Sequence, residues 1–362
     1  MKRLIPALLL GILFPEPALT ARNRQDADRA LTDRVAKWQI EHFDTVSFPL
    51  GHWTNAALYR GMAEWAARTN ADFIYDFLRE IGRKSDWDMP PRIYDADDLC
   101  VGQTYFELSE KYDDPRMIAK VKDRVDYIMA HSQTGSLRLP NGKYNRNRWG
   151  WCDALFMAPP VYVQLYLKTG KRDYLDFCTS EYKVTVDSLF DRNDNLFYRD
   201  LRLVNDRGKN GKKVFWGRGN GWVYAGLALM LQRIPKDDPV YGYYLDLFLK
   251  MSPAVLRCQD KAGSWHSSLY APEYYPQPEN SASGFFVYGM AWGVNHGILG
   301  KEYRKAAQKG WNALKSHVNG EGKLGYVQPI GHAPVEISGE MTAVYGVGAF
   351  LLAASEMMEM NL

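Results

Sequence analysis

The chain has 362 residues, of which 46% are hydrophobic, so it can bury a large core as an ordinary globular protein does. Its formal net charge of only +3 argues against an obligatory polyanionic partner such as nucleic acid. Its 11 tryptophans and 23 tyrosines supply many aromatic rings, which suit either the C–H faces of sugars or a large aromatic core.

The first residues have the pattern of a secretory signal peptide. Lys2 and Arg3 precede an apolar stretch at residues 4–14, which is too short to span a bilayer, and the small residue Ala21 follows. We therefore expect residues 1–21 to be a signal peptide and the protein to be secreted across the inner membrane into the periplasm. Residues 22–362 are then expected to form the catalytic domain.

Most of this domain has the period of amphipathic helices. More polar helical stretches are expected at 24–42, 71–83, 115–130, 172–189, 239–257 and 302–317. More apolar stretches alternate with them, at about 54–69, 97–112, 152–170, 219–234, 281–299 and 341–358. Roughly twelve helices in this order indicate six helical hairpins. A simple solenoid is the alternative, but the chain has no repeat of fixed length to support it.

Four linkers are long, and each of them precedes an apolar helix; they lie near 136–151, 190–217, 259–281 and 318–340. Long structured loops are usually functional, and in these positions all four would emerge on one face. If the apolar helices form an inner ring, they run parallel and their N-termini share one rim. We therefore predict an all-α fold, an (α/α)6 barrel, with a site at that rim.

Polar and aromatic residues gather at the starts of the apolar helices, as this fold requires. They are Trp53, Asp97 and Asp98, Trp151 and Asp153, Arg218 and Trp222, Asn280 and Ser283, and Glu336 and Glu340. The four cysteines lack the spacing of a metal site, and the chain has no GxSxG, Walker or HExxH motif. We therefore expect neither a metal nor an organic cofactor.

Asp153 lies in the stretch "RWGWCDALFMAPP" at the start of an expected helix. Trp149 and Trp151 would shield its carboxyl from water, which raises a carboxyl pKa and favours a proton donor. The helix N-terminus acts in the opposite direction, and the alternative role for Asp153 is simple complementarity to the helix dipole.

Asp97 and Asp98 are either an N-cap pair or part of the site. Two carboxylates from different inner helices at one rim would suit general acid and base chemistry on sugars. Arg218, in "FWGRGNGWVYAG", offers a planar fork for a carboxylate, or else makes a structural salt bridge. His266, in "GSWHSSLY", donates to a sugar hydroxyl or is merely solvated.

Four segments together resemble glycoside hydrolase family 105, the unsaturated rhamnogalacturonyl hydrolases, over nearly the whole mature chain: "WGWCDALFMAPP", "FWGRGNGWVYAGLA", "ENSASGFFVYGMAWGV" and "YGVGAFLLAASE". The resemblance implies an (α/α)6 barrel that acts on oligosaccharides left by polysaccharide lyases, which carry a 4-deoxy-Δ4,5-unsaturated uronic acid at the non-reducing end. It also implies hydration of the double bond. An aspartic acid protonates C4, water adds at C5, and the hemiketal opens and releases the neighbouring sugar.

The resemblance assigns roles to individual residues. Asp153 matches the catalytic acid/base of the family, and the second family aspartate aligns with Asp97, with Asp98 as a close rival. Arg218 and Trp222 match an arginine and a tryptophan of the substrate pocket.

In one loop the chain departs from the family. Many relatives have a histidine in the loop written here as "DNLFYRDLR", where this chain has Tyr198, Arg199 and Asp200. Arg199 is then the expected substitute in substrate binding. The sugar at the +1 position stays open, as does the parent polymer, which is rhamnogalacturonan, ulvan, arabinogalactan or another uronate-bearing glycan.

Two alternative functions remain at this point: an inverting glycosidase on saturated sugars, and a glycan-binding protein without turnover. The expected partner is the unsaturated oligosaccharide, with neither nucleic acid nor membrane, and the chain is expected to be a monomer or a weak homo-oligomer.

Overall fold

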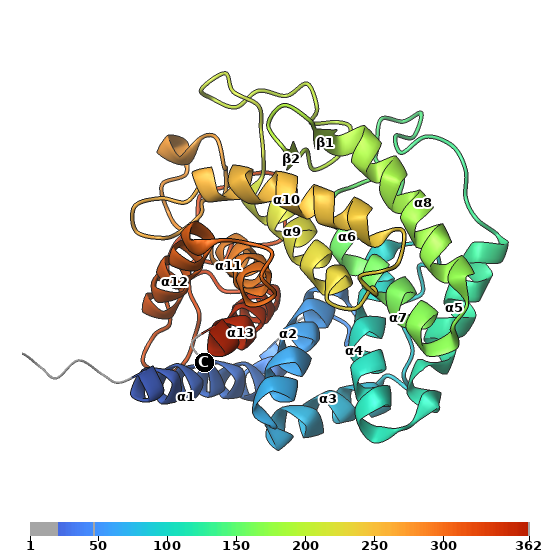
Figure 1. Cartoon of the computed structure of the whole chain (residues 1–362), viewed down its shortest axis with the longest axis horizontal. Coiled ribbons are helices and arrows are strands. Elements are labelled where there is room, and N and C mark those ends of the chain that lie inside the picture. The colour runs from blue at the N-terminus through green and yellow to red at the C-terminus, as the bar shows by residue number, and fades with distance from the viewer. Residues whose placement is uncertain (1–20, 46–47, 361–362) are drawn as a thin grey trace, which may run out of the picture.

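A computed structural model describes residues 21–45 and 48–360 of the chain. The predicted signal peptide falls, except for Ala21, outside these residues and stays a prediction. Figure 1 shows two concentric layers of helices around a common centre. Within the described part, no helix is long and apolar enough to cross a membrane.

The inner layer consists of the predicted apolar helices. They are α2 (Trp53–Thr69), α4 (Ala96–Tyr112), the pair α6 (Ala154–Met157) and α7 (Pro159–Thr169), α9 (Gly217–Leu231), α11 (Asn280–Asn295) and α13 (Val344–Met360). Each packs against the next, and α13 packs against α2, so the ring is closed. The (α/α)6 barrel predicted from the sequence is therefore confirmed.

The outer layer consists of the more polar helices. They are α1 (Ala21–Glu41), α3 (Asp72–Lys84), α5 (Ala119–Ala130), α8 (Arg172–Leu189), α10 (Tyr241–Arg257) and α12 (Lys301–Ser316). Three short 3-10 helices also occur: η1 (Phe43–Thr45), η2 (Pro115–Ile118) and η3 (Pro272–Tyr274). The strands β1 (Phe190–Asp191) and β2 (Leu196–Phe197) pair antiparallel after α8.

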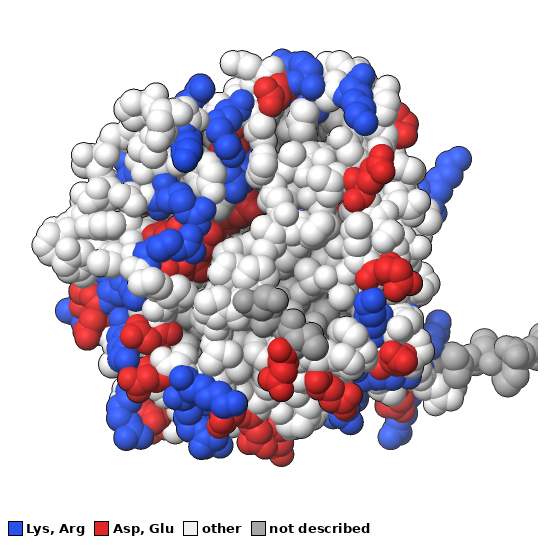
Figure 2. Space-filling model, turned by 180° about the vertical axis from the view of Figure 1, so that it is seen from behind, with Lys and Arg blue, Asp and Glu red and all other residues white. Residues whose placement is uncertain are grey.

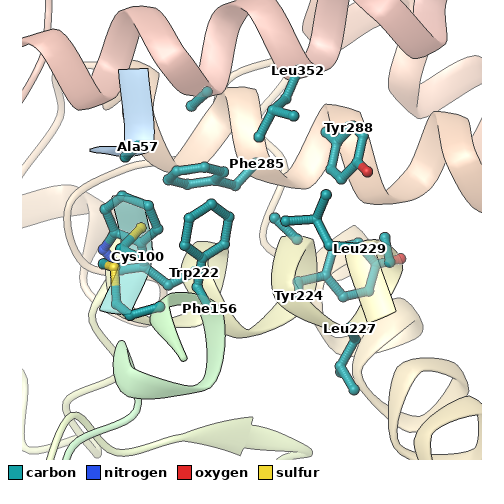
Figure 3. Close-up of a cluster of buried hydrophobic side chains, with 14 of the residues drawn as sticks. Ala57, Cys100, Phe156, Trp222, Tyr224, Leu227, Leu229, Phe285, Tyr288 and Leu352 are labelled. Atoms are coloured by element: carbon teal, nitrogen blue, oxygen red, sulfur yellow. The ribbon is translucent and has the colours of Figure 1, made fainter. Parts of the chain in front are cut away.

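Every inner element contributes to the core at the centre of the ring. Figure 3 shows this core, to which α2 supplies Ala57, α4 Cys100, α6 Phe156, α9 Trp222, α11 Phe285 and α13 Leu352. The ring of Trp222 lies 4.3 Å from that of Phe285 and 4.7 Å from that of Phe156, centroid to centroid. The core therefore ties all six hairpins together directly beneath the rim.

The ring closes through a glycine contact between α2 and α13. A Cβ placed on Gly61 would lie 2.2 Å from the carbonyl oxygen of Gly348, and a Cβ on Gly348 would lie 2.2 Å from that of Ala57. Both distances are far below van der Waals contact, so only glycine lets the two backbones approach this closely.

The third inner helix is broken where the sequence has Pro159 and Pro160. A proline has no N–H to donate to the carbonyl four residues earlier, so the carbonyl of Phe156 loses its normal helical partner. The side-chain amide of Gln103 on α4 donates instead to the carbonyl oxygens of Phe156, at 2.8 Å, and Met157, at 3.0 Å. This contact holds α6, which directly follows Asp153, against α4.

Two details of the predicted elements needed correction. The last inner helix was expected from about residue 341, but α13 begins at Val344. Glu336 and Glu340 therefore lie in the preceding segment and do not open the helix. All four cysteines are free thiols.

Candidate active site

A cavity of about 590 Å³ opens at the face where the inner helices begin. This volume lies in the usual range for small-ligand sites. On this side of the molecule, acidic side chains lie in a hollow bordered by basic ones (Figure 2). The cavity is lined by His52, Trp53, Pro90, Arg92, Asp97, Tyr144, Arg146, Trp151, Asp153, Met157, Arg199, Ile330, Gly331 and His332.

Asp153 is the N-cap residue of α6 and is only 8% exposed. Burial raises the pKa of its carboxyl, and the charges of Arg199 and Arg218 oppose this rise. The thiol of Cys152 donates a weak hydrogen bond to Oδ2 of Asp153 at 3.4 Å. The upward shift favours the protonated carboxyl, as a proton donor needs.

Asp97 lines the same cavity from the first turn of α4. Burial and the neighbouring charge of Asp95 raise its pKa to about 7, the charge of Arg146 opposes this, and the charge of Asp153 adds to the rise. Nη2 of Arg146 donates to Oδ2 of Asp97 at 2.8 Å. Two carboxyl groups with raised pKa values therefore share one cavity, which is typical of an acid–base site.

Asp98 is fully buried but is not among the lining residues. Its carboxylate accepts from the backbone N–H of Arg92 at 2.9 Å and from Nε of Arg92 at 3.1 Å. Of the two candidates for the second carboxyl in "DADDL", Asp97 lies at the cavity. Asp98 instead holds the segment that carries Arg92.

Arg199 enters the cavity from the loop that follows β2. Its carbonyl accepts from the backbone N–H of Cys152 at 2.8 Å, which fixes the loop beside Asp153. Nη1 donates to Asp200 at 2.8 Å, while Nε lies 3.9 Å from Oδ2 of Asp153. Nε is buried and has no hydrogen-bond partner among the described residues.

Tyr144 and Arg146 were not singled out in the sequence, although both lie in the long linker before α6. The guanidinium groups of Arg199 and Arg146 lie over the ring of Tyr144, at 4.3 and 5.7 Å from its centroid. Arg146 also lies over the ring of Trp151, at 5.3 Å. The only sequence signal for these residues was the length of the linker.

Arg218 lies near Asp153 but does not line the cavity. Its guanidinium is held between the rings of Trp216 and Tyr345, at 4.5 and 4.8 Å. Nη1 and Nη2 donate to the carbonyl oxygens of Gln328, at 2.6 Å, and Pro329, at 3.0 Å. In this arrangement Nη1 and Nη2 of Arg218 anchor the segment before α13, while its Nε is buried and has no hydrogen-bond partner among the described residues.

Three further predicted residues also lie away from the cavity lining. Trp222 belongs to the core drawn in Figure 3. Trp149 is 4% exposed and packs edge-on against Tyr162. His266 contacts the carbonyl of Gln277 through Nδ1 at 3.0 Å, and its Nε2 lies 3.2 Å from Oδ2 of Asp260. Of the predicted substrate-binding residues, the structure therefore brings Trp151 and Arg199 to the cavity.

Similar proteins agree with this architecture. The sequence model of the protein family named Glycosyl Hydrolase Family 88 matches residues 31–361 of the chain. The chain belongs to this family. The resemblance to unsaturated uronyl hydrolases seen in the sequence is thereby confirmed, with family 88 as the one whose model matches.

Two curated relatives cover most of the chain. A protein of Alteromonas sp. (strain LOR) is 32% identical over 96% of this chain and 89% of its own. One of Formosa agariphila is 35% identical over 91% of this chain and 89% of its own. Both are named unsaturated 3S-rhamnoglycuronyl hydrolase. The solved structure of a glycosyl hydrolase family 88 protein from Bacteroides vulgatus has a TM-score of 0.84 at 30% identity, over 93% of this chain and 99% of its own.

Within the described part of the chain, no group of three or more His, Cys, Asp or Glu side chains could hold a metal ion.

Proposed function

We propose that the protein removes a 4-deoxy-Δ4,5-unsaturated uronic acid from the non-reducing end of oligosaccharides produced by polysaccharide lyases. One observation carries this proposal: Asp97, Asp153 and Arg199 line a single cavity, and Arg199 is buried beside Asp153. A guanidinium there supplies the charge that a uronate needs, within reach of a carboxyl that can move a proton. The family and the names of the two curated relatives support the same activity.

The chemistry that fits this arrangement is hydration of the vinyl ether. Protonated Asp153 gives its proton to C4, water adds its oxygen to C5, and the proton lost by that water returns to Asp153. The resulting hemiketal opens to a ketone at C5, and the hemiacetal left at C1 then releases the neighbouring sugar as an alcohol. One water molecule is consumed, and Asp153 ends as it began. Asp97 orients this water or tunes the pKa of Asp153.

Arg199 is the proposed partner of the uronate carboxylate. Its Nε is buried without a partner among the described residues, and a buried unpaired donor is costly until a ligand pairs with it. The names of the two relatives make rhamnose-linked unsaturated uronyl oligosaccharides the first substrate class to test.

The test is loss of the ultraviolet absorbance of the C4=C5 double bond when lyase products are added to the enzyme. Asp153→Asn should abolish this loss, because an amide cannot supply the proton, while circular dichroism shows an unchanged helical fold. An active Asp153→Asn protein would contradict the assignment. Release of reducing sugar from saturated oligosaccharides with no change in absorbance would indicate the inverting glycosidase instead.

We further propose that the protein reaches the periplasm through cleavage near Ala21. The support is the basic and apolar pattern of residues 1–21. Mass spectrometry of the mature N-terminus from the native host tests this, and an intact Met1 on the exported protein would contradict it.

A further inference from the structure

A second cavity, of about 520 Å³, lies beside the catalytic one, and we call it the outer cavity. It is formed by the end of α1, by Phe48, by the start of α2, and by the start of α13 with the segment that precedes it. Its lining residues are Trp38, Gln39, His42, Phe48, Thr54, Pro329, Ile330, Thr342, Ala343, Val344 and Tyr345.

The outer cavity adjoins the catalytic cavity. Ile330 lines both of them and is 49% exposed, so its side chain lies at the boundary. Two pairs of stacked rings form the rest of the shared wall. Phe48 stacks on His52 with centroids 4.5 Å apart, and Tyr345 stacks on Trp53 at 5.4 Å. In each pair the first ring faces the outer cavity and the second faces the catalytic one.

The two cavities differ in charge. Three arginines and two aspartates line the catalytic cavity, whereas no Lys, Arg, Asp or Glu is found among the described residues that line the outer one. Figure 2 shows a hollow with charged side chains and, next to it, a broad area of surface that has none. A sulfated or uronate sugar would meet no Lys or Arg side chain among the described residues of the outer cavity, so a neutral ligand fits this lining better.

The lining also contains the groups that bind a neutral sugar. Phe48 is 40% exposed and Trp38 is partly exposed, so aromatic faces are available to the C–H face of a pyranose. The indole Nε1 of Trp38 is buried and makes no hydrogen bond to the described residues. This donor would be satisfied by a sugar hydroxyl. Exposed apolar surface next to an active site is typical of a ligand contact.

We propose that the outer cavity binds a neutral sugar of the leaving oligosaccharide, beyond the sugar that is bonded directly to the unsaturated uronyl residue. This inference rests on the proposed function. It makes the enzyme selective for chain length, because a disaccharide ends before the outer cavity, whereas a tetrasaccharide reaches it.

The test compares two substrates, an unsaturated uronyl disaccharide and a tetrasaccharide whose sugars beyond the uronyl residue are neutral. The wild type should have the higher kcat/KM for the tetrasaccharide. In Trp38→Ala the ratio of the two values should fall roughly tenfold, through KM, since the lost contact is uniform binding. Trp38→Phe keeps an aromatic face but loses Nε1–H, so its ratio should lie between the two.

Tyr274→Ala is the matched control. Tyr274 is an exposed aromatic residue on η3, 39% exposed, and it lines neither cavity. Its ratio should equal that of the wild type. Equal ratios for wild type and Trp38→Ala, with both substrates hydrolysed, would overturn the inference and leave the proposed function intact.

A tetrasaccharide sulfated only beyond the sugar that is bonded directly to the uronyl residue supplies the second arm. The neutral tetrasaccharide should be hydrolysed with the higher kcat/KM, and a preference for the sulfated one would overturn the neutral-sugar assignment. If the enzyme hydrolyses neither the disaccharide nor any of the tetrasaccharides, the proposed function itself is refuted.

Discussion

Nε of Arg199 lies 3.9 Å from Oδ2 of Asp153, and no described residue accepts a hydrogen bond from it. The two groups therefore interact by charge, which lowers the pKa of Asp153 against the upward effect of burial. A substrate carboxylate at Arg199 would neutralise that effect and let the pKa of Asp153 rise as the substrate binds. Binding and proton delivery are thus expected to be linked through this pair.

Replacement of Arg199 tests this link. We expect Arg199→Gln to lower kcat/KM roughly 10- to 100-fold, since a charge-assisted contact to the uronate is lost. The same change removes a charge that lowers the pKa of Asp153, so the alkaline limb of the kcat/KM profile should move to higher pH. Steady-state kinetics between pH 5 and pH 9 measure both effects.

Arg202→Gln is the matched control for this variant. Arg202 pairs with the same Asp200 and lies over the same Tyr144 ring, at 5.2 Å, but it does not line the cavity. It should cause a much smaller loss and no shift of the alkaline limb. Equal losses in the two variants would mean that Arg199 acts only by supporting Asp200.

Asp97 should give the enzyme an ionisation close to neutral pH. Its pKa is raised to about 7, mainly by burial, so its carboxyl changes charge between about pH 6 and pH 8. Asp97→Asn should remove this ionisation from the pH–rate profile and lower kcat roughly 100-fold. Asp98→Asn should retain the ionisation while lowering the melting temperature, because Asp98 holds Arg92. The opposite pattern would identify Asp98 as the second active-site carboxyl.

Glu356 predicts a pH dependence of stability at the other end of α13. Burial raises its pKa from 4.5 to about 7, Asn295 opposes this through a 2.8 Å hydrogen bond, and the charge of Glu64 adds to the rise. Between these two pH values the folded chain binds a proton that the unfolded chain has released. The free energy of unfolding therefore falls as pH rises through this window, by at most about 3 kcal/mol.

Glu356→Gln should flatten this dependence, because an amide stays neutral. Thermal unfolding from pH 4.5 to pH 8 should show a smaller fall in melting temperature than in the wild type, with the remaining slope due in part to Asp97. Turnover of the substrate should be unaffected, since Glu356 does not line the catalytic cavity. An unchanged slope would show that Glu356 does not hold its proton in the folded chain.

Gln103 should matter for both stability and activity without lining the cavity. Gln103→Leu leaves the carbonyls of Phe156 and Met157 buried without their donor, at a cost of about 1–3 kcal/mol. Because α6 directly follows Asp153, kcat should fall as well. Urea unfolding measures the first effect, and Gln133→Leu, at a surface residue, is the control. A Gln103→Leu protein with wild-type stability would show that water replaces the amide.

The sequence predicted the barrel and its active face because both depend on pattern. The alternation of apolar and polar helices identified the two layers, and the polar residues at the starts of the apolar helices, among them Asp97, Asp153 and Trp151, predicted a common rim. Only the contacts of the folded chain separated Asp97 from Asp98, because adjacent residues on a helix point about 100° apart and nothing in the sequence defines which of these directions faces the cavity.

The partners of each side chain lay beyond the sequence. Arg218 has the residue type and position of a ligand-binding group, yet two carbonyls of a distant segment accept hydrogen bonds from both of its terminal nitrogens. Tyr144 and Arg146 act through contacts with Arg199 and Asp97, which lie about 50 residues away along the chain. Such pairings depend on how the loops fold over the rim, and period alone does not encode that.

The contact between Gly61 and Gly348 joins the beginning of the barrel to its end. During synthesis, the first hairpin therefore lacks its neighbour on one side until α13 has been made. Ile330, Gly331 and His332 also come from this late part of the chain. The substrate pocket is therefore complete only when this late part of the chain has packed against α2, and a molecule truncated before α13 is expected to be inactive as well as unstable.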